Sequence, residues 1–69
     1  MNDKLTPREL EIVKWKARGC TVQEIAEHMQ ISPKTVKGRI GKIYDKLNVD
    51  NAIQMLRKLN EEGVDVWNL

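Results

Sequence analysis

The feature that most constrains the fold is a series of helix-start signals along the chain. Two have the pattern Thr-x-x-Glu, at residues 6–9 and 21–24. In this capping box the threonine and glutamate side chains each accept a hydrogen bond from a backbone N–H group that the helix leaves without a partner. Ser32 stands directly before a proline, which favours the first helical position, and Asn51 stands three residues before a glutamine. These signals predict four helix starts.

Stop signals set the expected lengths of the helices. Gly19 can adopt the left-handed conformation that ends many helices, and Asn48 and Gly63 mark the ends of the third and fourth. The segment Ile31-Ser32-Pro33 ends the second helix, because a proline disfavours helical geometry in the residue before it. The expected helices run over residues 7–18, from Val22 for about two turns, over 33–47 and over 52–62.

The third helix has one apolar face. Its residues Val36, Ile40, Ile43 and Leu47 follow at spacings of four, three and four, which is the period of an amphipathic helix. No segment shows the pattern of a strand, and a chain of 69 residues allows one small domain. We therefore expect a single all-α, four-helix domain over residues 1–69.

The positive charge of the chain is concentrated in the third helix. The whole chain has a net charge of +2. Residues 1–32 are neutral, residues 33–48 carry five cations against Asp45 alone, and residues 49–69 have a net charge of −2. A segment with a net charge of +4 is typical of an element that binds a polyanion. A solvated helix face with spare lysines is the alternative.

Residues 22–41 have the pattern of a helix-turn-helix, in which a short helix and a tight turn precede a longer helix with a basic face. Ala26 is small at the point where the two helices must approach closely. Apolar residues around the turn are expected to fix the angle between the helices; they are Ile25, Met29, Ile31 and Val36. The outward side chains of the third helix can then enter the major groove of DNA.

Three linked motifs resemble the LuxR/GerE-type DNA-binding domain of bacterial transcription regulators. They are LTPRE at residues 5–9, EIA at 24–26 and ISPKTVK at 31–37. The resemblance covers roughly residues 5–60 and implies a four-helix domain whose third helix reads DNA and whose fourth helix forms the dimer contact. Members of this family usually form the C-terminal part of a larger regulator, whereas we expect this chain to be a stand-alone member.

The predicted set of DNA-binding residues combines positions that match the family, among them Lys34, Thr35 and Lys37, with further residues of this chain. The full set is Thr21, Lys34, Thr35, Lys37, Gly38, Arg39, Gly41, Lys42 and Lys46. The positions of Gly38 and Gly41 are those that most often differ among family members to choose bases. Glycine destabilises a helix interior by about 1 kcal/mol relative to alanine. Either the two glycines let the helix backbone lie closer to DNA, or this face has lost sequence reading and binds something else.

The fourth helix, expected over residues 52–62, carries two neighbouring apolar stripes. One consists of Ile53 and Leu56, and the other of Ala52, Met55 and Leu59. A helix needs only one stripe to reach the core of a small domain. We therefore predict that the stripe of Ala52, Met55 and Leu59 forms a dimer interface, with a single wide core-facing arc as the alternative. The apolar tail after Gly63 can fold back over the helices or join the interface.

Enzymatic, metal-binding and membrane-spanning roles find no support in the sequence. Cys20 is the single cysteine and His28 the single histidine, so neither a disulfide nor a metal site at ligand spacing is expected. We predict no cofactor, no catalytic residue and no membrane contact, since no apolar run approaches the roughly 20 residues of a membrane span. The polar start shows no signal peptide, so we expect a cytoplasmic protein, located on the nucleoid through DNA binding.

The predicted function is a sequence-specific, DNA-binding transcription regulator that binds double-stranded DNA as a homodimer. The alternative keeps the fold but makes the chain an adaptor or antagonist that binds another regulator or RNA polymerase. The glycines at 38 and 41 favour this alternative, whereas the net charge of +4 on the same helix favours DNA.

Overall fold

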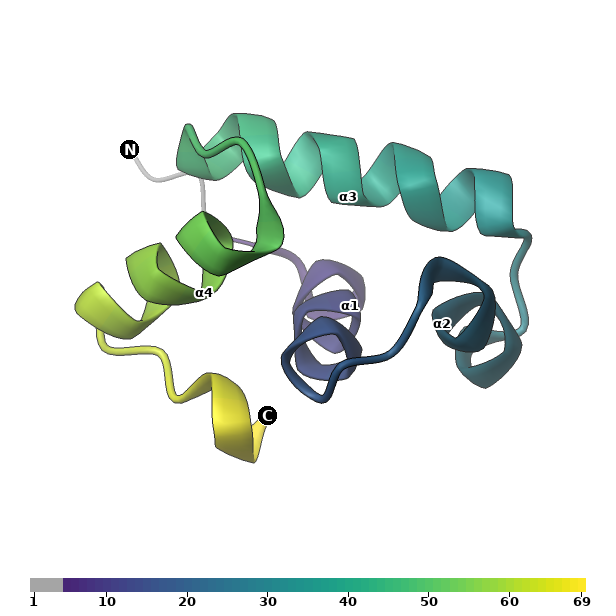
Figure 1. Cartoon of the computed structure of the whole chain (residues 1–69), viewed down its shortest axis with the longest axis horizontal. Helices are drawn as coiled ribbons and strands as arrows, with labels where there is room; N and C mark the ends of the chain where they lie inside the picture. Colours follow the sequence, from purple (N-terminus) through teal and green to yellow (C-terminus); the bar gives the residue numbers. More distant parts are fainter. Residues whose placement is uncertain (1–4) are drawn as a thin grey trace.

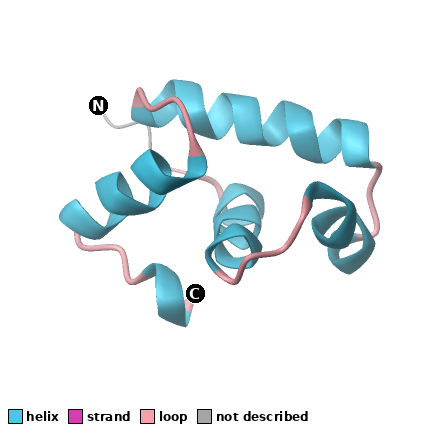
Figure 2. Ribbon diagram, viewed as in Figure 1, coloured by secondary structure: helices cyan, strands magenta, loops and turns pink. Residues whose placement is uncertain are grey.

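The predicted helix starts recur in a computed structural model, which describes residues 5–69 of the chain. The helices are α1 (Pro7–Ala17), α2 (Val22–Met29), α3 (Pro33–Leu47) and α4 (Ala52–Glu61), and a short 3₁₀ turn, η1 (Val66–Asn68), follows them. Figure 2 shows that helices and loops make up this whole part of the chain, without a strand. The all-α, four-helix prediction is confirmed.

Side-chain caps hold the first turn of each helix. The two capping boxes form in full: Thr6 N–H donates to Glu9 Oε1 at 2.8 Å, and Thr21 N–H donates to Glu24 Oε1 at 2.8 Å. The threonine hydroxyls accept the return hydrogen bonds. At α3, Ser32 Oγ accepts a hydrogen bond from the backbone N–H of Thr35, the third residue of the helix, at 3.1 Å. These local bonds fix where each helix begins.

All four helices also end in one way, with a left-handed residue followed by an apolar residue that packs on the core. The left-handed residues are Gly19, Gln30, Asn48 and Gly63. The backbone N–H of the next residue donates to the carbonyl five residues earlier, in the bonds Cys20 to Trp15, Ile31 to Ala26, Val49 to Tyr44 and Val64 to Leu59. This is the Schellman arrangement, which returns the chain toward the bundle after each helix.

The end of α2 differs from the prediction. The helix stops at Met29, because Gln30 takes the left-handed conformation with φ 58°. The segment Ile31-Ser32-Pro33, which was expected to end the helix, lies beyond this stop, and Pro33 begins α3 as predicted. Helices α1 and α4 each end one residue earlier than predicted, at Ala17 and Glu61. None of these helices among residues 5–69 is long and apolar enough to cross a membrane.

The helices surround one apolar core. In Figure 1, α3 runs along the top, α1 is seen end-on below it, α2 lies to the right and α4 to the left. The fully buried side chains of the core come from all four helices; they are Ile12, Val13, Ile25, Val36, Ile43 and Met55. Helix α3 contacts the other three helices, so its position is fixed along its whole length.

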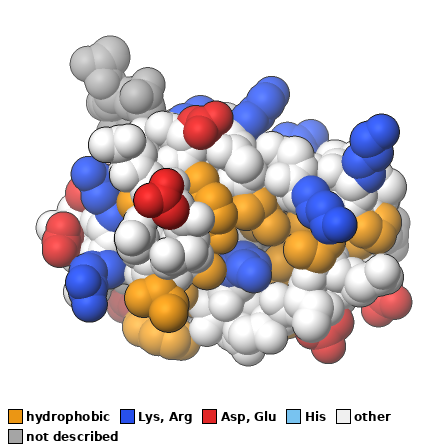
Figure 3. Space-filling view, turned by 45° about the horizontal axis from the view of Figure 1, so that its top comes forward, with side chains coloured by type: hydrophobic (Ala, Val, Ile, Leu, Met, Phe, Trp, Pro, Cys, Tyr) orange, Lys and Arg blue, Asp and Glu red, His pale blue; other side chains and the backbone are white. Residues whose placement is uncertain are grey.

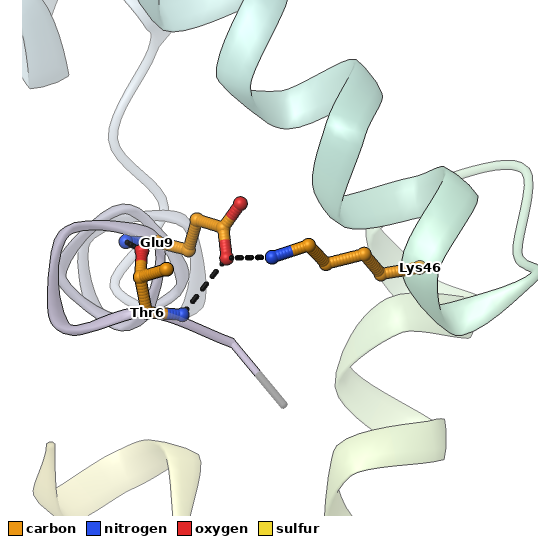
Figure 4. A network of polar contacts seen from close by, with 3 residues as sticks. All are labelled: Thr6, Glu9 and Lys46. Carbon is orange, nitrogen blue, oxygen red and sulfur yellow. Dashed lines mark hydrogen bonds and ion pairs between the residues drawn. The ribbon is translucent and has the colours of Figure 1, made fainter. Parts of the chain in front are cut away.

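A partly buried ion pair joins the start of α1 to the end of α3. Lys46 Nζ lies 2.8 Å from Glu9 Oε1, the same oxygen that accepts the N–H of Thr6 (Figure 4). Glu9 is the one buried charged residue among residues 5–69. Burial raises the pKa of this carboxyl, but the hydrogen bonds from Lys46 and Thr6 and the charge of Lys46 outweigh it, so the pKa lies below its ordinary value of 4.5.

We expect Lys46→Met to lower the free energy of unfolding at pH 7 by about 1–3 kcal/mol, because it leaves a buried carboxylate without its charged partner. Urea or thermal unfolding measures this change. Adding Glu9→Gln to Lys46→Met is expected to recover part of the loss, since a glutamine at this position can still cap Thr6 without a charge. A double variant less stable than Lys46→Met would contradict this account.

The same pair makes stability depend on pH. Because the folded-state pKa of Glu9 is lowered, its contribution is complete above the unfolded-state pKa and is lost as the pH falls through the folded-state value. The stability advantage of the natural chain over Glu9→Gln is therefore expected to be largest near neutral pH and to shrink below about pH 4.5. Unfolding curves of both proteins between pH 2 and 7 measure it, and a constant difference would contradict it.

The tail after α4 folds back over the bundle. Val66 is 4% exposed and belongs to the core, whereas Trp67, the next residue, is 68% exposed. The turn η1 packs on α1 and α4, and the Asp65 carboxylate accepts the N–H of Trp67 at 3.2 Å. The sequence left open whether the tail folds back over the helices or joins a dimer interface. In the structure, Val66 packs on the helices of its own chain.

Val66→Ala is expected to lower the free energy of unfolding by about 2 kcal/mol, because it removes buried methyl groups between η1 and the helices. Trp67→Ala in the same turn is the matched control, and its effect is expected to stay within about 0.5 kcal/mol. Urea unfolding of the two variants distinguishes them. Equal losses would show that the turn acts through something other than burial of Val66.

Candidate nucleic-acid interface

Helix α2 and the turn after it set the position of α3. Ile25 on α2 and Val36 on α3 are both fully buried in the core, and Ala26 between the helices is 4% exposed. Ile31 in the turn packs against the same core. The predicted packing around residues 22–41 is therefore present, and these residues form a helix-turn-helix.

An aromatic stack fixes α2 against α1. The ring centroids of Trp15 and His28 are 4.0 Å apart and the rings are parallel within 4°. Lys14 Nζ lies 4.5 Å from the centroid of the Trp15 ring, and the Arg18 guanidinium carbon lies 5.5 Å from it. His28 is exposed, as the sequence predicted, but its contact with Trp15 was not foreseen. Two aromatic residues on separate helices carry no spacing signal that would predict it.

The outward face of α3 is basic over its first three turns. Its exposed residues in this part are Lys34, Thr35, Lys37, Gly38, Gly41 and Lys42. Arg39 is half-buried beside them. In Figure 3, blue Lys and Arg side chains stand out along the upper and right-hand surface, where α3 runs. We call residues 34–42 the basic face of α3.

Lys46 does not belong to the basic face. Its amino group is held by Glu9 at 2.8 Å, which gives it a structural role. We therefore leave Lys46 out of the proposed DNA contacts, although the sequence analysis included it. Asp45 beside it is exposed and would repel phosphates. Residues 34–42 nevertheless hold four cations and no acidic residue, so the positive charge is confined to the N-terminal part of the helix.

A shallow hollow of about 270 Å³ lies on the basic face. It is lined by Thr35, Gly38, Arg39 and Lys42. The Thr35 hydroxyl lies 2.9 Å from Ser32 Oγ, so the N-terminal cap of α3 also orients a residue of the hollow. A hydroxyl, a guanidinium and an ammonium group around one hollow are suited to oxyanions such as phosphate.

Three of the predicted contact residues, Thr21, Gly38 and Gly41, are exposed and lie at the start of α2 or on α3. Thr21 is exposed at the N-terminus of α2, and its hydroxyl oxygen accepts the N–H of Glu24 at 3.1 Å. Gly38 and Gly41 are exposed, and a Cβ atom added at either would meet no atom within 4 Å. The packing of the chain itself therefore does not require glycine at these positions.

The assignment of the two stripes on α4 was wrong. Met55 and Leu59 are 1% and 3% exposed and belong to the core, so they are not available to a second protein. Ala52 is half-buried. Ile53, from the other stripe, is 74% exposed. Periodicity shows that two stripes exist, but it does not show which one the rest of the bundle covers.

Residues 5–69 contain no group of three His, Cys, Asp or Glu side chains that could hold a metal ion. Cys20 is a half-buried free thiol packed against the core. The described residues thus form a helix-turn-helix that presents a basic helix, and such a surface is suited to a polyanion.

Comparison with known families identifies this arrangement. Residues 3–60 match the family described as "Bacterial regulatory proteins, luxR family". The chain belongs to this family. It is a LuxR-type helix-turn-helix DNA-binding domain, as the motifs at residues 5–9, 24–26 and 31–37 predicted, and its family is one of regulators rather than enzymes.

Several curated relatives resemble this LuxR-type domain. Transcriptional regulatory protein UhpA of Escherichia coli is 37% identical over 57 residues, which are 83% of this chain and 29% of that protein. Transcriptional activator protein YukR of Yersinia ruckeri is 43% identical over 53 residues, which are 77% of this chain and 23% of that protein. Transcriptional regulatory protein DesR of Bacillus subtilis is 37% identical over 59 residues, which are 86% of this chain and 30% of that protein. The chain spans less than a third of the length of each.

Proposed function

We propose that this chain regulates transcription by binding specific sites in double-stranded DNA through the basic face of α3. The observation that carries the proposal is the clustering of four cations without an acidic residue at positions 34–42, on the exposed side of the second helix of a helix-turn-helix. The major groove admits a helix and displays base edges that differ between base pairs. The relatives named as transcriptional regulators support the same function.

The contacts divide by chemistry. Lys34, Lys37 and Lys42 are exposed and can neutralise phosphates on the two sides of the groove. Thr35 is placed by Ser32 at the start of the helix, where the residues of a helix-turn-helix that contact base edges lie. We assign Thr21, the exposed N-cap residue of α2, a contact with the DNA backbone. Lys46 takes no part, because Glu9 holds it.

The proposed assembly is a homodimer in which α4 of one copy meets α4 of the other. Ile53 replaces Met55 and Leu59 as the central residue of this interface, since it is the exposed large apolar side chain of α4. Two-fold symmetry would place two copies of α3 on two half-sites. Binding of another regulator or of RNA polymerase through α3 is the alternative, and the absence of acidic residues from positions 34–42 supports DNA instead.

We expect Lys37→Ala to weaken DNA binding and to reduce the slope of log K against log salt by about one unit, because one phosphate contact is lost. The measurement uses duplexes selected from a random pool at near-physiological salt, with affinities determined at several salt concentrations. Lys14→Ala is the matched control, since Lys14 lies over Trp15 on α1, away from the basic face.

The two lysine variants separate a local contact from a general effect of charge. A contact at Lys37 predicts a change in slope for Lys37→Ala and little change for Lys14→Ala. Equal slopes for Lys37→Ala and the natural chain would remove Lys37 from the interface. Failure of the natural chain to enrich any duplex would contradict the proposed function as a whole.

Ile53→Ser is expected to weaken self-association at least tenfold, since burial of one isoleucine contributes about 1.5–3 kcal/mol and each dimer buries two. Sedimentation equilibrium measures the dimer dissociation constant. Trp67→Ser is the matched control, because among residues 5–69 it removes the other large exposed apolar side chain, on η1 rather than on α4. A larger effect of Trp67→Ser than of Ile53→Ser would place the interface on the tail.

A further inference from the structure

The turn η1 carries an exposed tryptophan to which the proposed function gives no role. Trp67 is 68% exposed and lies outside residues 3–60, which match the family. Val66, the residue before it, is buried in the core. The Asp65 carboxylate accepts hydrogen bonds from the Trp67 N–H at 3.2 Å and from the Asn68 amide at 2.6 Å. A large aromatic side chain on such a fixed turn is the kind of residue that anchors protein interfaces.

Trp67 stands in an acidic segment of the chain. Residues 61–69, which we call the acidic tail, contain three carboxylate side chains and no lysine or arginine. All three carboxylates are exposed; they belong to Glu61, Glu62 and Asp65. An aromatic anchor accompanied by carboxylates complements a surface that offers cations around a hollow.

Two hollows on the described residues differ in how well they suit this anchor. A hollow of about 350 Å³ lies on α1 beside Leu69, and its lining contains one acid and one base, Glu11 and Lys14. The hollow of about 270 Å³ on the basic face has two cations in its lining, Arg39 and Lys42, and no acid. The charge of the acidic tail therefore favours the hollow on the basic face over the one on α1.

The acidic tail is held away from the basic face of its own chain. Among the described elements, the turn η1 packs on α1 and α4 and has no contact with α3. In Figure 1, α3 runs along the top of the molecule and the C-terminal turn lies at the bottom, with α1 between them. The burial of Val66 keeps the turn in this place. A tail on the basic face must therefore come from another molecule, and a second copy of this chain carries one.

We infer that the acidic tail of one copy docks on the basic face of a second copy, with Trp67 in the hollow of that face. Arg39 and Lys42 then hold the indole ring by cation–π attraction, while Glu61 and Glu62 oppose the exposed lysines of the face. The tail and DNA compete for one surface, so a copy that is bound to a tail is withheld from DNA. The contact between copies goes beyond the proposed function, and only its competition with DNA rests on that function.

This contact differs from the proposed dimer in symmetry and in salt dependence. Two different surfaces meet head-to-tail, whereas the contact between α4 helices joins the same surface of both copies. Pairs of exposed carboxylates and lysines are screened by salt, whereas the burial of Ile53 is not. At about 1 M salt, where the Debye length is about 3 Å, the α4 contact is therefore expected to dominate. The comparison of Ile53→Ser with Trp67→Ser reports on α4 under that condition.

An exchange of charges between two chains tests the contact. Both chains carry Ile53→Ser, which removes the proposed α4 contact. One adds Glu61→Lys and Glu62→Lys, and the other adds Lys34→Glu and Lys37→Glu; these side chains are all exposed. At about 0.05 M salt, each chain alone is expected to self-associate at least tenfold more weakly than the Ile53→Ser chain, because its tail and its face now have like charge. An equal mixture of the two is expected to restore association, which sedimentation equilibrium measures.

Two further variants of the Ile53→Ser chain separate the anchor from a general effect of charge. Trp67→Ala removes the anchor without a change in charge, and at least a tenfold loss of self-association is expected. Glu27→Lys together with Asp50→Lys is the matched control, because it changes the net charge as much as the tail variant does, at exposed positions outside the tail. This control is expected to self-associate like the Ile53→Ser chain. Unfolding curves of every variant show whether a loss comes from misfolding.

The outcomes separate the inference from the proposed function. Restored association in the mixture and its loss in Trp67→Ala support the contact between copies, and a selected DNA duplex that disperses the assembly supports the competition. A duplex that binds and leaves the assembly intact overturns the competition. An Ile53→Ser chain that does not self-associate at low salt, or a mixture that does not restore association, overturns the contact. If the natural chain retains no duplex while the mixture restores association, the proposed function is overturned and the contact between copies stands.

Discussion

The ion pair between Glu9 and Lys46 joins the first turn of α1 to the last turn of α3, and the orientation of α3 depends on it. Glu9 Oε1 caps the first turn of α1 and at the same time holds the last turn of α3. At its other end α3 is fixed by the turn after α2 and by the burial of Val36. A helix held at both ends and packed along its length presents its outer side in one orientation, which is what a rigid groove on DNA requires.

The lysines of this chain show how one residue type serves different physical roles. Lys46 stabilises a buried carboxylate, and Lys14 lies over the ring of Trp15. The lysines of the basic face have no acidic residue among positions 34–42 to compensate them. Net charge along the sequence could not separate these roles. It marked residues 33–48 as a whole and gave no sign that Lys46 pairs with Glu9.

Local signals predicted most of the fold, because caps and left-handed stops act within five residues. The starts at Thr6, Thr21 and Ser32 were therefore readable from the sequence. Gln30 was not, since glutamine has no general preference for the left-handed conformation that it adopts. The roles of Lys46 and Ile53 depend on residues or elements far along the chain, and a periodic pattern contains no information about which of two neighbouring stripes is covered.

The four identical helix ends have a kinetic consequence. Each end is closed by a hydrogen bond that spans five residues, so most of the backbone order in this domain is built from short loops, which is the condition for folding on the microsecond to millisecond scale. The ion pair across 37 positions and the docking of η1 on α1 close much longer loops. Helices α2 and α3 can thus assemble early, and the tail can dock on the core afterwards.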